Sequence, residues 1–158
     1  MNRVGFSKDI HRLESGHKFI LGGIEIPFDK GEVAHSDGDV LLHAVGESIL
    51  GALALGDLGK HFPDNDPNTE GMDSSLIVKK IIEMMDDKGF KVGNIDVFIS
   101  CEKPKLASYI DSMRSNVAKL LNTSIDNVSI KAGTNEGCDA VGKGEAIEVF
   151  CISNLISK

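Results

Sequence analysis

The sequence predicts an α+β fold in which a single layer of helices covers a mixed β-sheet. Its 158 residues, 41% of them apolar, suit one domain with a hydrophobic core. The apolar pattern changes along the chain in the order strand, hairpin, helix, helix, strand, helix, strand, strand. No repeat, low-complexity tract or linker interrupts this order, so residues 1–158 are predicted to form a single domain.

The first strand is predicted over 3–7, and the polar residues Asp9 and His11 follow it. In extended backbone, residues two apart point to the same side, so these two side chains can reach one atom together. Residues 18–28 are predicted to form a hairpin that turns at Gly22-Gly23.

Residues 34–43 read Ala-His-Ser-Asp-Gly-Asp-Val-Leu-Leu-His, and an apolar segment follows them. Ser36 and Asp39 are spaced like a capping box, which predicts a helix that begins near Ser36. Helical composition continues to Leu55, and Gly56 is the expected stop.

A helix that begins near Ser36 places His35, Asp39 and His43 one turn apart on one face. Two interpretations of His43 stay open at this point: a metal ligand, or an ordinary histidine of an amphipathic helix. Asp37 and Asp39 are expected to favour the helix start, and Asp39 also to orient His35 or His43.

The remaining elements alternate helices with strands. We expect a helix over 76–88 capped by Ser74 or Ser75, a strand over 94–100, a helix over 106–121, and strands over 127–132 and 145–156. Residues 29–32 are interpreted as a polar connection. The polar segments at 9–11, 57–66, 101–105 and 133–136 are expected to gather at one rim, as function-bearing loops usually do.

The composition excludes several classes of partner. A formal net charge of −7 disfavours nucleic acid and anionic membranes, and no apolar run approaches the roughly 20 residues of a membrane span. Three cysteines without a CxxC pair favour a reducing compartment, argue against a thiolate zinc site, and include at least two expected core thiols. These features together predict a cytosolic location.

Four motifs together resemble one enzyme family. In chain order they are Asp-x-His, His-Ser-Asp-Gly-Asp-x-x-x-His, Ala-Leu-Gly-Asp-Leu-Gly-Lys-His-Phe-Pro-Asp-Asn-Asp-Pro, and Gly-x-Gly-Glu near the end. Through them the chain resembles the 2-C-methyl-D-erythritol 2,4-cyclodiphosphate synthase family of the non-mevalonate isoprenoid pathway, from Arg3 to Ile156.

This resemblance implies a fold, an assembly and a reaction. The fold is a four-stranded mixed sheet with a chorismate-mutase-like βαβαββ core and an N-terminal hairpin. The assembly is a homotrimer with active sites between subunits. The substrate is 4-diphosphocytidyl-2-C-methyl-D-erythritol 2-phosphate, whose 2-phosphate attacks its own β-phosphorus and expels CMP. The implied cofactors are zinc and a second divalent ion, magnesium or manganese. The implied location is the bacterial cytoplasm, or a plastid stroma after removal of a transit peptide.

The resemblance also assigns roles to residues. Asp9, His11 and His43 are the implied zinc ligands, and Glu136 the ligand of the second ion. Three protein ligands leave one tetrahedral position open, as in catalytic zinc sites. His35 and Thr134 are the implied catalytic residues, which donate hydrogen bonds to the phosphates.

The implied substrate-binding residues come from every polar segment of the chain. They are Asp9, His11, His35 and Ser36; Asp57, Leu58, Gly59, Phe62, Pro63, Asp64, Asn65 and Asp66 for the methylerythritol; Cys101, Glu102, Lys103, Pro104, Lys105, Leu106 and Ala107 for the cytidine, from the neighbouring subunit; and Gly133, Thr134, Asn135, Glu136, Ala140 and Lys143.

Several positions depart from the family pattern, in the segments 5–9, 133–135 and 137–140 and at Lys143, and two of them bear on a ligand at the trimer axis. Ala140 stands where a bulky residue is usual, and Lys143 where arginine is common in some members. Relatives can hold an isoprenoid diphosphate there, and a lysine cannot reproduce a bidentate arginine grip. Two alternatives to the synthase remain: a zinc phosphohydrolase that uses a metal-bound hydroxide, and a non-catalytic trimer that binds an isoprenoid diphosphate.

Overall fold

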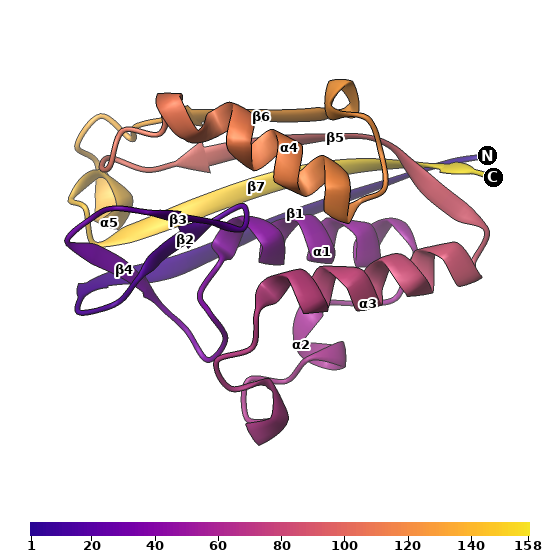
Figure 1. The fold of residues 1–158 in the computed structure, drawn as a ribbon, viewed down its shortest axis with the longest axis horizontal. Helices are drawn as coiled ribbons and strands as arrows, with labels where there is room; N and C mark the ends of the chain where they lie inside the picture. Colours follow the sequence, from indigo (N-terminus) through magenta and orange to yellow (C-terminus); the bar gives the residue numbers. More distant parts are fainter.

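A five-stranded sheet forms one layer of the molecule, with strand order β4-β1-β7-β5-β6 (Figure 1). The computed structural model describes all of residues 1–158. The sheet strands are β1 Asn2–Ser15, β4 Lys30–Val33, β5 Phe90–Ser100, β6 Val128–Gly133 and β7 Ala146–Ser157. β2 Phe19–Leu21 and β3 Ile24–Ile26 form the expected hairpin. The α-helices are α1 Val40–Ala52, α2 Leu58–His61, α3 Ser74–Asp87, α4 Ile110–Leu120 and α5 Asp139–Gly142.

The sheet is mixed, as predicted. β5 and β6 are parallel, whereas β1 pairs antiparallel with β7 and β4, and β7 antiparallel with β5. The expectation of four strands was wrong by one, because residues 30–33 pair with 12–15 of β1 at the sheet edge. A ladder of backbone hydrogen bonds does not require apolar side chains, so the polar composition of this segment concealed its strand.

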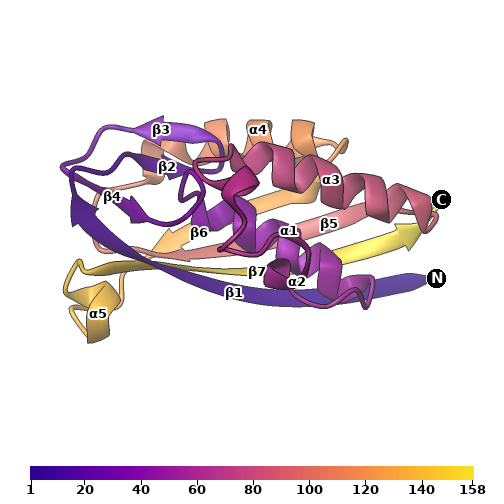
Figure 2. The same cartoon turned by 90° about the horizontal axis from the view of Figure 1, so that it is seen from below.

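The helices α1, α3 and α4 lie on one face of the sheet, and the buried apolar core fills the space between the two layers (Figure 2). The short helix α5 projects from the opposite side. None of the helices is both long and apolar enough to cross a membrane.

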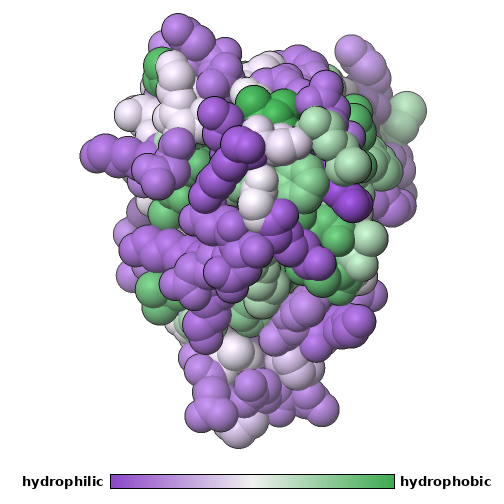
Figure 3. All heavy atoms as spheres, turned by 90° about the vertical axis from the view of Figure 1, so that its right-hand side faces the viewer, coloured by the Kyte–Doolittle hydropathy of each residue, from purple (hydrophilic) through white to green (hydrophobic).

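The sheet face away from these helices carries exposed apolar side chains. Phe6 of β1 and Ile152 of β7 are paired across the two strands and are 61% and 48% exposed. Val4 and Ile10 of β1 and Phe98 of β5 are also exposed. Figure 3, which views the end that carries both termini, shows hydrophobic surface between hydrophilic regions.

The helix α1 begins later than predicted. Its cap is Asp39, whose Oδ1 accepts a hydrogen bond from Leu42 N at 3.0 Å, and its first residue is Val40 rather than a residue near Ser36. The same carboxylate accepts from Gly22 N at 3.0 Å and Gly23 N at 2.7 Å. The carboxylate therefore joins the hairpin turn to the start of α1. The expectation that Asp39 orients an imidazole was wrong, because its hydrogen bonds come from backbone N–H groups.

The bounds of other helices and strands also differ from the predicted ones. The segment 57–66 contains α2, and the helix expected over 106–121 is a short 3₁₀ turn, Ala107–Tyr109, followed by α4. The helix α3 is capped by Asp73, which precedes the two serines proposed for that role. Residues 9–11 lie inside the 14-residue strand β1 and do not form a turn.

The helix α1 lies very close to β1, and Gly5 permits this approach. A Cβ atom at Gly5 would overlap the carbonyl oxygen of Ser48 and lie 2.6 Å from Ala52 N. Two residues along β1, Ser7 Oγ donates to the carbonyl oxygen of Ala44 at 2.5 Å. This contact fixes the part of α1 that carries His43.

We expect Gly5→Ala to lower the free energy of unfolding by about 1–3 kcal/mol or more, because the methyl group overpacks the contact between helix and strand. Gly51→Ala is the matched control. Its Cβ would meet only ordinary contacts, the closest at 3.8 Å, and alanine favours a helix by up to about 1 kcal/mol. Urea unfolding of both variants measures the difference; equal stability of the two variants would contradict the proposed contact.

Candidate metal centre and adjoining pockets

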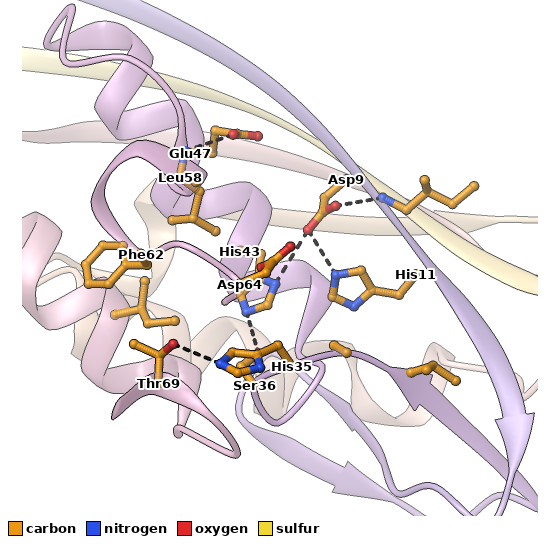
Figure 4. A pocket seen from close by; sticks show the side chains of 15 residues that line it. Asp9, His11, His35, Ser36, His43, Glu47, Leu58, Phe62, Asp64 and Thr69 are labelled. Carbon is orange, nitrogen blue, oxygen red and sulfur yellow. Dashed lines mark hydrogen bonds and ion pairs between the residues drawn. The ribbon is translucent and has the colours of Figure 1, made fainter. Parts of the chain in front are cut away.

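Three side chains from two layers of the fold meet at one point (Figure 4). Asp9 and His11 come from β1 and His43 from α1, and their ligand atoms all lie within 4.8 Å of one another. Asp9 Oδ2 is 3.2 Å from His11 Nε2 and 3.5 Å from His43 Nδ1. The alternation of side chains along β1 therefore brings Asp9 and His11 together, as the sequence predicted.

The hydrogen bonds of His11 leave one ring nitrogen free for a metal. Its Nδ1 lies 2.8 Å from the carbonyl oxygen of Gly38, which can only accept, so the proton of the neutral ring is on Nδ1. Nε2, on the side of Asp9, then carries a lone pair. Two imidazole nitrogens and a carboxylate oxygen are a donor set that zinc binds, and three ligands leave a fourth position open.

The contacts within the triad change the pKa values of Asp9 and His11. Burial of Asp9 opposes its ionisation, but hydrogen bonds and charge from His11 and His43 outweigh burial and hold the pKa of this carboxyl well below its usual range. Burial also favours neutral His11, yet the Asp9 carboxylate raises the pKa of that imidazole above its usual value. A metal at this position would therefore compete with a proton on His11.

A cavity of about 340 Å³ adjoins the triad. Eight of the expected binding residues line it: Asp9, His11, His35, Ser36, Leu58, Gly59, Phe62 and Asp64. Four others from the same group, Asp57, Pro63, Asn65 and Asp66, do not line it. The Asp57 carboxylate instead caps α2, where it accepts from Lys60 N at 2.9 Å.

His35 connects the cavity wall to the following loop. Its Nε2 lies 2.8 Å from the carbonyl oxygen of Asp66 and 3.1 Å from Thr69 Oγ1. The carbonyl oxygen requires the proton on Nε2, so Nδ1 is the remaining ring nitrogen. In a neutral ring with its proton on Nε2, Nδ1 carries a lone pair, so the expected donor role of His35 toward a phosphate needs the doubly protonated ring.

The sequence interpretation missed two polar residues of this cavity, Glu47 and Thr69. Glu47 lies four residues after His43 on α1, and its Oε1 accepts from Leu58 N at 3.1 Å. The helical spacing from His43 was a signal that could have identified Glu47. Thr69 lies in a 3₁₀ turn, Pro67–Thr69, with no periodic pattern to indicate it.

A second cavity, of about 280 Å³, lies beside the carboxyl ends of the parallel strands β5 and β6. It is lined by Cys101, Pro104, Lys105, Leu106, Ala107, Ile110, Ala132, Gly133 and Thr134, most of which belong to the expected binding residues. Cys101 N donates to the carbonyl oxygen of Gly133 at 3.0 Å, and Asn135 N to Glu102 Oε1 at 2.7 Å. Burial raises the pKa of Cys101 to about 12, so this thiol is un-ionised.

The two cavities share no lining residue. Thr134 belongs to the second, and Glu136, Lys103 and Lys143 line neither. Ala140 lines a further cavity together with Ile10 and Arg12. One chain therefore brings together the triad and its neighbours, and separately the segment 101–107 with 133–134, but does not bring these two groups into one site.

The fold and the triad define an α+β protein in which three side chains that could hold a metal ion stand beside a polar cavity. The family model described as the YgbB family matches residues 2–156. The 2-C-methyl-D-erythritol 2,4-cyclodiphosphate synthase of Brachyspira hyodysenteriae is 50% identical over 153 residues, 97% of each chain. That of Clostridioides difficile is 51% identical over 158 residues, 99% of this chain and 98% of its own.

Solved structures agree with these relatives. A bifunctional IspDF from Campylobacter jejuni matches all of this chain and 43% of its own, with 32% identity and a TM-score of 0.96. IspF from Plasmodium falciparum in complex with CDP matches 99% of this chain and 97% of its own, with 30% identity and a TM-score of 0.88. The chain belongs to the YgbB family, and it is an enzyme of the same kind as these cyclodiphosphate synthases.

We expect the affinity for zinc to fall as pH decreases through the raised pKa of His11, because a metal must displace the proton there. The loss should approach about tenfold per pH unit if one proton is released. His43→Ala should abolish tight binding, whereas His17→Ala, a change at an exposed histidine, should not. Chelator competition between pH 5.5 and 8 measures this. An affinity that does not change with pH would contradict the assignment of His11.

Proposed function

We propose that the chain converts 4-diphosphocytidyl-2-C-methyl-D-erythritol 2-phosphate to 2-C-methyl-D-erythritol 2,4-cyclodiphosphate and CMP. The observation that carries this proposal is the Asp9, His11 and His43 triad at the edge of a polar cavity, in a chain about 50% identical to synthases of that name over its whole length. In the reaction an oxygen of the 2-phosphate bonds to the β-phosphorus. The bond from that phosphorus to the bridging oxygen breaks, and CMP leaves with this oxygen.

The triad is proposed to hold zinc, and Glu136 a second divalent ion, magnesium or manganese. Zinc held by these three residues would supply Lewis acidity toward a phosphate oxygen. The nucleophile is already an anionic phosphate of the substrate, so the chain needs no general base, and its residues act through positioning and charge. Leu58 and Phe62 offer apolar walls for the methylerythritol, and Asp64 an acceptor for its hydroxyl groups.

His35 and Ser36 are proposed to contact the phosphates from the cavity next to the triad. His35 is held by the Asp66 carbonyl oxygen, which leaves Nδ1 for a phosphate. His35 would donate from Nδ1 in its doubly protonated form.

The cytidine is proposed to occupy the second cavity, between Pro104, Leu106 and Thr134. The relative from Plasmodium falciparum was solved with CDP, which supports a cytidine ligand for this chain. Lys105 is the cationic side chain of this cavity. Thr134 at its edge is proposed to donate to the phosphates.

A homotrimer is proposed because the two cavities of one chain are separate. Each active site would combine the triad cavity of one subunit with the 101–107 segment of its neighbour. The exposed apolar side chains Val4, Phe6, Phe98 and Ile152 on the uncovered sheet face support burial of that face between subunits.

We expect zinc- and magnesium-loaded protein to release CMP from this substrate, and His43→Ala to lower the rate at least about 100-fold because charge stabilisation is lost. Turnover in oxygen-18 water separates this reaction from hydrolysis: internal cyclisation leaves the diphosphate product unlabelled, whereas a phosphohydrolase introduces label. If the substrate stayed intact after incubation with the loaded enzyme, both cyclisation and hydrolysis would be rejected. That result is the one expected of a non-catalytic trimer.

We expect two inactive variants to complement each other if sites are shared between subunits. His43→Ala damages the triad cavity and Thr134→Ala the other. In mixed trimers formed by co-expression, about a quarter of the sites combine two intact halves, so about a quarter of wild-type CMP release should return. His43→Ala mixed with His11→Ala is the matched control and should recover nothing. Absence of recovery in the first mixture would place both halves in one chain.

A further inference from the structure

The outer nitrogen of His43 faces two hydroxyl groups. Its Nε2 lies 2.9 Å from Ser74 Oγ, the first residue of α3, and 3.1 Å from Ser36 Oγ. A hydroxyl can donate or accept, so these contacts alone do not decide which ring nitrogen carries the proton. That choice matters, because Nδ1 is the nitrogen that faces Asp9.

Asp37 removes the ambiguity. The hydroxyl of Ser74 donates its only proton to Asp37 Oδ1 in a short hydrogen bond. Ser74 Oγ must then accept from His43, which places the ring proton on Nε2 and a lone pair on Nδ1. Ser74 is completely buried, so water does not compete for these bonds.

Asp37 is itself held in place from both sides. Its Oδ2 accepts from Ser74 N at 3.0 Å, and its Oδ1 from Asp39 N at 3.1 Å. Its backbone N–H donates to the carbonyl oxygen of Met72 at 3.1 Å. The carboxylate therefore ties residues 37–39, which lead into α1, to the first residue of α3.

We infer that Ser74 and Asp37 are positioning residues, which fix the Nε2–H tautomer and the ring orientation of His43 so that Nδ1 is ready to bind a metal. The inference rests on the proposed metal role of His43. Gly38 does the same for His11 through its carbonyl oxygen. The chain thus prepares both imidazoles as neutral ligands through groups that never contact the metal.

The hydrogen bonds that lead from Asp37 through Ser74 to His43 form a relay, which Ser74→Ala and Asp37→Asn test. Both should weaken zinc binding, measured by chelator competition on folded protein, about 10- to 100-fold. Asp73→Ala is the matched control: Asp73 Oδ1 caps the same helix through Ser75 N at 2.9 Å but makes no hydrogen bond to His43. It should lower the thermal midpoint, yet leave the zinc affinity within about threefold of wild type.

The tautomer of His43 is a second readout that needs no substitution. Nitrogen-15 chemical shifts of the metal-free wild type, recorded where the ring is neutral, should show the proton on Nε2, and Ser74→Ala should show a mixture of tautomers. A wild-type proton on Nδ1 would overturn the inference, as would unchanged zinc affinity in Ser74→Ala or equal weakening in Asp73→Ala. If the proposed metal role itself were wrong, the wild type would bind no zinc, and this outcome is distinguishable from failure of the inference about the tautomer.

Discussion

The contact between α1 and β1 is the constraint on which the rest of the structure depends. The absence of a side chain at Gly5 lets the backbone of α1 lie against the strand, and the hydroxyl of Ser7 donates to the Ala44 carbonyl oxygen. Because His43 precedes Ala44, this contact sets how far the histidine stands from Asp9 on the same strand. The geometry of the candidate metal centre is therefore set by the packing of α1 on the sheet.

Two buried acids hold the elements around this contact. Asp39 fastens the hairpin to α1 through three backbone N–H groups, and its burial raises its pKa to about 6 in spite of them. Glu32 of β4 is buried as well, and burial, with the Asp39 carboxylate adding to it, raises its pKa to about 8. Glu32 is therefore protonated at neutral pH, and the interior carries less negative charge than the composition indicates.

Structural features that depend only on local geometry could be predicted from local sequence patterns. The two-residue spacing of Asp9 and His11, the glycine hairpin and the order of helices and strands could be predicted from sequence. The edge strand β4 could not, because its ladder to β1 is made by backbone atoms. Nor could the relay of Asp37 and Ser74, which lie 37 residues apart and meet only when α3 packs beside α1. The resemblance to known enzymes supplied the grouping of His43 with Asp9 and His11.

The triad takes its ligands from two different layers, two from the sheet and one from the helix that covers it. An ion bound there would be a cross-link between layers, comparable to a staple that closes the chain between residues 9 and 43. Since such an ion binds only the folded chain tightly, a concentration 100 times its dissociation constant would add about 2.7 kcal/mol to folding. The thermodynamic stability of the two-layer fold would then depend on the concentration of metal available in the cell.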